Sequence, residues 1–248
     1  MSLDVMQTLA VHRTQREFTS RTVSDELMTK LVTAAQHMPT SQYLQAYSLI
    51  EITQPDLRTN LARITTMPTV GKNGRLFVIL ADQHRNVTLV PGKTAQRALS
   101  EFDRFAGSIE DATLMTAALV MAAESQGLGS VVLGSINNAT QAVINLLHLP
   151  KLTLPVFGLQ LGYPTTRPEV KPRLPLDALW FKNRYAEPAD YRVQLDQFDQ
   201  QLHAYYQSRS TNARDEHLAQ MTTEALHSAA KRRDFLKVVR RQGFLPEA

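Results

Sequence analysis

The hydrophobic and polar positions of this 248-residue chain follow two periods that alternate along the sequence. Short runs dominated by apolar and β-branched residues are typical of buried strands, whereas apolar residues three to four positions apart are typical of helices. The first pattern predicts strands over Tyr47–Ile52, Leu76–Ala81, Ser130–Leu133 and Pro155–Leu161. Because helical segments lie between these strands, the pattern predicts a fold of the α+β class.

Helix signals fill the intervals between the predicted strands. Ser24 can cap a helix whose first turn holds Asp25 and Glu26, and Pro39 follows the end of that helix. Further helices are predicted over Asp4–Ala10, Pro55–Arg63, Ser108–Gln126, a segment from an Asn138 cap to Leu147, Tyr191–Gln207 and Glu216–Arg241.

The segment Ser108–Gln126 gives the strongest helical pattern, and it has almost no polar face. A helix that is apolar on nearly all sides is buried, either centrally or at a subunit interface. Gly127 follows it and is expected to end the helix as a C-terminal cap.

The character of the chain changes near residue 164. Five of the twelve prolines fall between Pro164 and Pro188, which predicts an extended connector, and two polar helices follow it. We therefore expect an α+β core over residues 1–163, and an arm with a helical appendage of the same domain over residues 164–248.

Composition narrows the class of protein. Apolar residues make up 43% and charged residues 20%, which is typical of a soluble globular protein. The absence of cysteine excludes disulfides, thiolate nucleophiles and cysteine-based metal sites. The first residues lack the features of a signal peptide, and no apolar run approaches the ~20 residues of a membrane span, so we expect a cytoplasmic protein that does not enter a membrane.

The usual catalytic motifs are missing. The sequence has no GxSxG, HExxH, strand-linked GxGxxG or Walker A pattern. None of its seven histidines is paired at helical i,i+4 spacing, so metal catalysis is not expected.

Basic clusters remain as candidate chemistry, in keeping with a formal net charge of +4. Each could bind an anion, although each alone is better explained as solvated surface. Lys231 to Arg241 suggests nucleic acid, but interleaved apolar residues favour a packed helix with a basic outer face. The other clusters are His12 with Arg13 and Arg16, Lys171 with Arg173, and Arg209 with Arg214.

The stretch from His12 to Phe18, HRTQREF, resembles the HRSxRxF opening of the FMN-dependent nitroreductase family. Matching pieces follow in order along nearly the whole chain, as in the NADPH-preferring branch of that family. They are Thr40–Gln45, Ala122–Gly129, Leu133–Asn138, Leu146–Pro150, Pro155–Leu159, Leu161–Pro164, Lys171–Pro175, Leu202–Tyr206 and Arg209–Asp215.

The resemblance implies a nitroreductase-like homodimer with a mainly antiparallel sheet flanked by helices, and FMN bound along the dimer interface. It implies an oxidoreductase that passes hydride by a ping-pong mechanism from NADPH through FMN to nitroaromatics, quinones or related acceptors. A reductase that supplies free reduced flavin is an alternative with the same site. An alternative of another class is a nucleic-acid-associated protein that uses the basic C-terminal helix, although no nucleic-acid or membrane partner is expected.

The resemblance also implies roles for individual residues. The FMN phosphate would be held by His12, Arg13 and Thr14 with Lys171 and Arg173, while Arg16 would stabilise the reduced ring. Thr40, Ser41 and Gln42 would contact the polar edge of the ring or the ribityl chain. Tyr43 would border the substrate cavity, and Arg209 with Arg214 would bind the NADPH 2′-phosphate. The N5 side would be lined by Val132, Leu133, Gly134 and Ser135.

The sequence departs from the family pattern at several of these positions. Thr14 replaces a serine, Val132 stands where the branch usually has tyrosine, and Ser135 stands where it has a second glycine. A glutamine that contacts the flavin in relatives falls near Met67-Pro68, where this segment is one residue shorter, so no residue is assigned as its equivalent. We expect these changes to affect substrate preference and reduction potential more than FMN binding.

Overall fold

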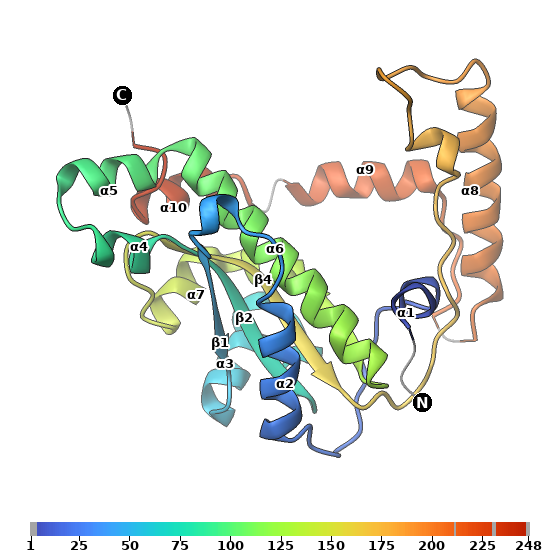
Figure 1. Ribbon diagram of the computed structural model, residues 1–248. Coiled ribbons are helices and arrows are strands. Elements are labelled where there is room, and N and C mark those ends of the chain that lie inside the picture. Colours follow the sequence, from blue (N-terminus) through green and yellow to red (C-terminus); the bar gives the residue numbers. More distant parts are fainter. Residues whose placement is uncertain (1–3, 211, 230–231, 247–248) are drawn as a thin grey trace. The chain divides into compact units, whose positions relative to one another are not determined.

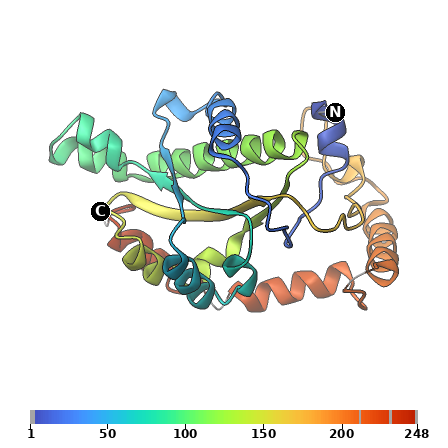
Figure 2. The ribbon, with the colours of Figure 1, turned by 90° about the horizontal axis from the view of Figure 1, so that it is seen from below.

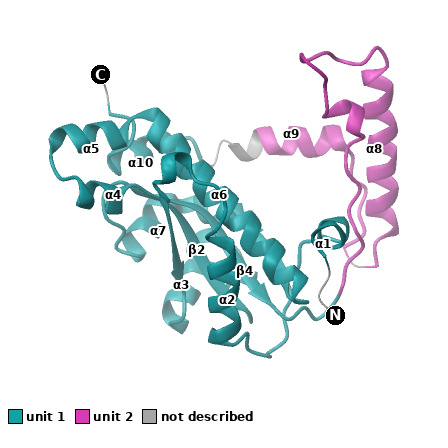
Figure 3. Cartoon of the chain, viewed as in Figure 1, with its two compact units in different colours: residues 1–166, 232–248 teal, residues 167–231 magenta. Residues whose placement is uncertain are grey.

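The computed structural model describes residues 4–210, 212–229 and 232–246. The chain divides into two compact units, one of residues 1–166 with 232–248 and one of residues 167–231 (Figure 3). The expected boundary at residue 163 lies close to this division, but the C-terminal residues belong to the first unit.

A four-stranded sheet forms the centre of the first unit, with strand order β1-β2-β4-β3 (Figure 1). Every neighbouring pair in it is antiparallel, as the resemblance implies. The strands are β1 (Tyr47–Glu51), β2 (Arg75–Asp82), β3 (Gly129–Leu133) and β4 (Thr153–Gly162).

The two faces of this sheet are both buried, which explains the continuous apolar run in β2. Phe77 and Ile79 pack into a cluster with residues of α2 and α6, whereas Leu76 and Val78 pack on the other face with residues of α3 and α7. This alternation follows the two-residue period of a strand. Figure 2 shows the helices on either side of the sheet.

Helices of the first unit surround the sheet. They are α1 (Val5–Ala10), α2 (Asp25–Ala35), α3 (Pro55–Thr65), α4 (His84–Leu89), α5 (Lys93–Ser100), α6 (Phe102–Ser125), α7 (Thr140–Leu146) and α10 (Phe235–Arg241). Short 3-10 turns are η1 (Ser41–Tyr43), η2 (Pro68–Gly71) and η3 (Gly134–Ala139).

Two predicted helix ends are confirmed. The Ser24 hydroxyl accepts a hydrogen bond from the Leu27 amide at 3.2 Å and caps α2. Gly127, at φ +79°, ends α6, because its amide and that of Leu128 bond back to carbonyls of the last turn. A left-handed residue at this position is what glycine allows without steric cost.

Other boundaries differ from the prediction. Helices α4 and α5 were not predicted, and α6 begins at Phe102 rather than Ser108. Asn138 does not cap α7, whose N-cap is Ala139, because η3 comes first and Asn138 donates instead to the Thr65 carbonyl. The helix predicted over Glu216–Arg241 is two helices, of which the second, α10, buries Val238 and Val239.

Helix α6 is the one described helix that is long and apolar enough to cross a membrane. Half of its apolar window is buried within the fold, and the core helix of a soluble protein passes the same test. The burial expected of this segment is confirmed, since Ala112, Leu119 and Ala123 are fully buried within the first unit.

The second unit is built on two helices, α8 (Tyr191–Ser208) and α9 (Leu218–Ala229). Phe198, Leu202 and Tyr206 of α8 form its small apolar cluster, against which Leu218 and Met221 of α9 pack. The proline-rich connector that precedes α8 contains one short 3-10 turn, η4 (Leu176–Ala178).

Candidate functional site

The N-terminal basic segment is fixed to the edge strand β3. Thr14 forms a bridge with Ser130, whose carbonyl accepts the Gln15 amide at 2.7 Å. The Gln15 side chain is buried against Gly129, where a Cβ atom would lie 2.6 Å from the Gln15 Cγ. Gln15 therefore points inward, while Thr14 and Arg16 on either side of it are exposed.

A buried carboxylate orients His12. The two Glu124 oxygens lie 2.9 and 3.0 Å from His12 Nδ1, and the Ser130 hydroxyl donates to the same carboxylate at 2.6 Å. The Glu124 side chain is only 10% exposed. Because a carboxylate accepts, the proton sits on Nδ1, and His12 keeps Nε2 for another partner.

The two arginines of this segment differ in their surroundings. Arg13 is half-buried, and its Nε donates to the Val11 carbonyl at 3.0 Å. Arg16 is exposed, and its guanidinium has no hydrogen bond or ion pair within the part of the chain that the structure describes. Arg16 thus offers an uncommitted planar set of donors.

The segment from Thr40 to Ala46 is held by a second buried carboxylate, Asp111 of α6. Its oxygens accept the Ser41 amide at 2.7 Å and the Ala46 amide at 2.9 Å. Between these anchors Gln42 and Tyr43 adopt positive φ, and Tyr43 is 82% exposed. Positive φ is uncommon for residues other than glycine, so the anchors stabilise a strained backbone.

The end of β3 presents a mixed surface. The Val132 side chain is 46% exposed, whereas Leu133 is buried in the sheet core and offers only its backbone outward. A Cβ atom at Gly134 would meet nothing within 4 Å, so this turn leaves open space. The Gly134 carbonyl accepts from Arg232 at 2.9 Å.

Three predicted binding residues carry buried polar atoms without a hydrogen-bond partner among the described residues. They are Thr40 Oγ1, Ser135 Oγ and Arg209 Nε. Buried polar atoms in folded proteins almost always have partners, so each such atom points to a missing ligand or water. Hydroxyl donors at Thr40 and Ser135 fit the polar edge of a flavin, and a guanidinium fits a phosphate, so the residues present fit FMN and NADPH.

Three cationic side chains of the second unit gather around one buried tyrosine. The Arg214 Cζ lies 4.2 Å from the centre of the Tyr206 ring, the Lys171 Nζ 5.1 Å and the Arg209 Cζ 5.9 Å. The Arg214 Nε is paired with Glu216, so its terminal nitrogens remain for other partners. Arg173 is exposed, and its guanidinium folds back on the Lys171 and Pro172 carbonyls.

The predicted phosphate-binding residues fall in different units. The first unit contains His12, Arg13 and Thr14. The second unit contains Lys171 and Arg173. Within the first unit, the His12–Arg16 segment is hydrogen-bonded to β3, and the Thr40–Tyr43 segment is held by a hydrogen bond to Asp111. The grouping of His12 with Lys171 stays a prediction.

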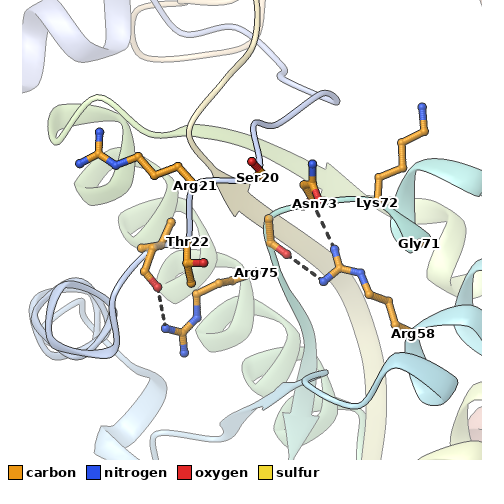
Figure 4. Close-up of a pocket in the computed structure, with 10 residues that line it drawn as sticks. Ser20, Arg21, Thr22, Arg58, Gly71, Lys72, Asn73 and Arg75 are labelled. Carbon is orange, nitrogen blue, oxygen red and sulfur yellow. Dashed lines mark hydrogen bonds between the residues drawn. The ribbon is translucent and has the colours of Figure 1, made fainter.

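A polar pocket of about 330 Å³ in the first unit was not predicted (Figure 4). Its arginines already have partners. Arg58 donates to the carbonyls of Val70 and Gly74, both at 2.8 Å, and Arg75 donates to Glu51 and Asp25, each at 2.6 Å. These bonds tie the pocket wall together, so Arg58 and Arg75 have a structural role.

Sequence reasoning missed the two carboxylates that hold the site, Asp111 and Glu124. Both lie on α6, whose other side chains are mostly apolar. Because a buried charge is costly unless it is hydrogen-bonded, an acid in such a helix is itself a signal that backbone amides or cations must come to it. Asp111 and Glu124 within the apolar sequence of α6 were such a signal.

Two family models match most of this chain. A family model described as "Nitroreductase family" matches residues 9–163, and one described as "Nitroreductase family, C-terminal domain" matches residues 171–247. The chain therefore belongs to the nitroreductase family, as the HRTQREF resemblance indicates.

Individual relatives span most or all of the chain. It is 34% identical to an "NADPH-dependent oxidoreductase" of Staphylococcus saprophyticus, over 99% of both chains. It is 35% identical to an "FMN reductase (NADPH)" of Bacillus subtilis, over 86% of this chain and 87% of that protein. The solved structure of the NfrA1 nitroreductase from Bacillus subtilis superposes with a TM-score of 0.91 at 32% identity, covering 97% of this chain and 99% of that one.

Proposed function

We propose that this protein is an FMN-dependent oxidoreductase that uses NADPH to reduce nitroaromatics, quinones or related small acceptors. The observation that carries the proposal is the similarity over nearly the whole chain to an NADPH-dependent oxidoreductase and to the NfrA1 nitroreductase. The unpartnered buried hydroxyls of Thr40 and Ser135 support it, because both residues were expected to face the flavin.

The phosphate end of FMN is assigned to the basic segment. His12 is oriented by Glu124 and keeps Nε2 for another partner. Arg13 and Thr14, the next two residues, add further donors. In the proposal Lys171 and Arg173 complete this set. Several cations around a dianionic phosphate bind through charge-assisted hydrogen bonds, so no glycine-rich phosphate loop is needed.

The ring end is assigned to Arg16 and to the two segments that α6 and β3 hold. When bound, FMN supplies hydride and electron transfer that side chains cannot perform. Arg16, which is uncommitted, places a fixed positive charge where negative charge develops on reduction. Thr40, Ser41 and Gln42 donate to the polar edge, and the backbone around Val132, Leu133, Gly134 and Ser135 forms the opposite wall.

Selection of NADPH is assigned to Arg209 and Arg214. A guanidinium recognises a phosphomonoester better than it recognises a ribose hydroxyl. The buried, unpartnered Arg209 Nε and the free terminal nitrogens of Arg214 supply the donors. Tyr43, which is exposed, borders the cavity in which the nicotinamide and the acceptor bind one after the other.

We further propose a cytoplasmic homodimer with FMN at the interface. Large exposed apolar side chains on α1 and on the connector support a second copy as a partner, since such surfaces are usually covered. They are Val5, Met6, Leu9, Leu176, Leu179, Trp180 and Tyr185. Sedimentation equilibrium of the purified protein tests this assignment, with twice the chain mass expected and a single chain mass contradicting it.

A reductase that releases reduced flavin is a second candidate, favoured by the similarity to the FMN reductase (NADPH) of Bacillus subtilis. Turnover with free FMN compared with turnover on a nitroaromatic and on menadione separates the two. The main proposal expects a higher kcat/KM for menadione or the nitroaromatic than for free FMN. The reverse order would assign the protein to flavin reduction.

A further inference from the structure

Four titratable side chains of the second unit lie together, and none of them is assigned to FMN or NADPH. His203 and Asp199 are on α8, and Asp215 and His217 precede α9. One ligand atom from each of His203, Asp215 and His217 lies within 4.8 Å of the others. The two imidazoles stack, with ring centres 4.2 Å apart and planes at 12°.

The donor set matches a borderline divalent metal. Zn²⁺ binds imidazole nitrogen and carboxylate oxygen with bonds of about 2.0 Å, so neighbouring ligand atoms of a tetrahedral site are about 3.3 Å apart. His203 Nδ1 and Asp215 Oδ1 are 3.3 Å apart. That nitrogen is buried and makes no hydrogen bond within the described chain, so it is available as a ligand.

Asp199 orients His217, the third of these residues. Its Oδ2 lies 2.7 Å from His217 Nδ1, and its Oδ1 accepts the Leu218 amide. A carboxylate on one imidazole nitrogen fixes the tautomer in which the other nitrogen can bind a metal.

We propose that His203, Asp215 and His217 form a Zn²⁺ site, with Asp199 as the residue that orients His217 and with water completing the coordination. Because the rings are nearly parallel, the His203 imidazole turns about its Cβ–Cγ bond to direct its nitrogen at the shared ion, while Asp199 keeps His217 in place. The ion then links the C-terminal half of α8 to the start of α9. Arg209 and Arg214 lie between these ligands in the sequence, so the site restrains the backbone that carries them.

The site was not visible in the sequence because its ligands are not at helical spacing. His203 and His217 are 14 positions apart, on either side of a turn. Only the folding of the segment after α8 back onto that helix brings the two rings into contact.

Calorimetric titration of the untagged, FMN-loaded protein with ZnCl₂ tests the proposal. Wild type should bind one Zn²⁺ per chain saturably, and MgCl₂ should give no such binding because Mg²⁺ prefers oxygen ligands and retains its water. The double variant His203→Asn/His217→Asn should lose that binding, and His84→Asn, an exposed histidine on α4, should retain it.

A second variant keeps all three ligands. Asp199→Asn should weaken Zn²⁺ binding on the order of 10- to 100-fold, as expected for loss of an orienting partner. Absence of saturable binding to wild type, or equal binding to wild type and the double variant, would overturn the site. Unchanged affinity in Asp199→Asn would overturn the role given to that carboxylate.

Discussion

At the scale of single residues, the arginines of this protein are of two kinds. Some are paired with groups of the protein itself, and others have no such partner among the described residues. Arg58 and Arg75 are bound by the protein's own carbonyls and carboxylates and stabilise the fold. Arg16 and the Nε of Arg209 have no such partner within the described chain. A positively charged group without a hydrogen-bond partner in the protein is suited to bind an anionic ligand.

Replacement of Arg209 by alanine should raise the KM for NADPH by roughly 10- to 100-fold, the range expected for a lost hydrogen bond to a charged group. The KM for NADH should change little, because NADH lacks the 2′-phosphate. Steady-state kinetics with both nucleotides measure the effect.

The matched control for that variant is Arg192→Ala, which removes an exposed arginine paired with Asp196 one turn along α8. It should leave both KM values unchanged. A proportional rise in KM for NADPH and NADH in Arg209→Ala would contradict the 2′-phosphate assignment.

Glu124→Gln should weaken FMN binding by about tenfold, because the neutral amide no longer favours the Nδ1 proton that orients His12. The amide oxygen can still accept from Ser130, so the melting temperature should fall little. Equilibrium dialysis of free FMN gives the affinity. An unchanged affinity would show that His12 needs no carboxylate for its role.

At the scale of elements, α6 organises the site. Asp111 near its middle holds the Thr40–Ala46 segment, and Glu124 near its C-terminus holds His12. The helix is the core of the first unit and therefore rigid, so segments anchored to it keep their positions. Irregular segments become precise when a regular element fixes them.

Asp111→Asn should destabilise the fold by about 1–3 kcal/mol, because the amide nitrogen can no longer accept from one of the two buried backbone amides. Hydrogen exchange at the Ser41 and Ala46 amides should accelerate more than exchange in β2. The control Glu110→Gln changes the preceding, exposed acid on the same helix and should alter neither. Equal acceleration in β2 would mean that Asp111 supports the whole fold rather than this segment.

Much of the element pattern could be predicted from the sequence. The strand positions and the ends of α2 and α6 follow from local rules, because capping and period depend on neighbouring residues. Helices α4 and α5 were missed because they are short and polar, and their packing against the unit gives most of their stability. The break between α9 and α10 was missed because no proline or glycine interrupts the pattern there.

At the scale of the whole molecule, the site depends on residues far apart in the chain. The motif around His12 and the residues of β3 could be assigned by resemblance, but Glu124 and Asp111 could not. The site segments that they hold, at His12, Ser41 and Ala46, are 65 to 112 positions away, and no local pattern records such pairings. The same reason explains why the His203–His217 pair became visible only in the folded second unit.

The most direct test of the central claim is the visible absorption spectrum of the purified protein before and after anaerobic addition of NADPH. The account predicts a yellow protein that carries one FMN per chain and loses its flavin absorbance with one equivalent of NADPH. A colourless protein that takes up no added FMN would contradict it, as would a bound flavin whose absorbance NADPH leaves unchanged.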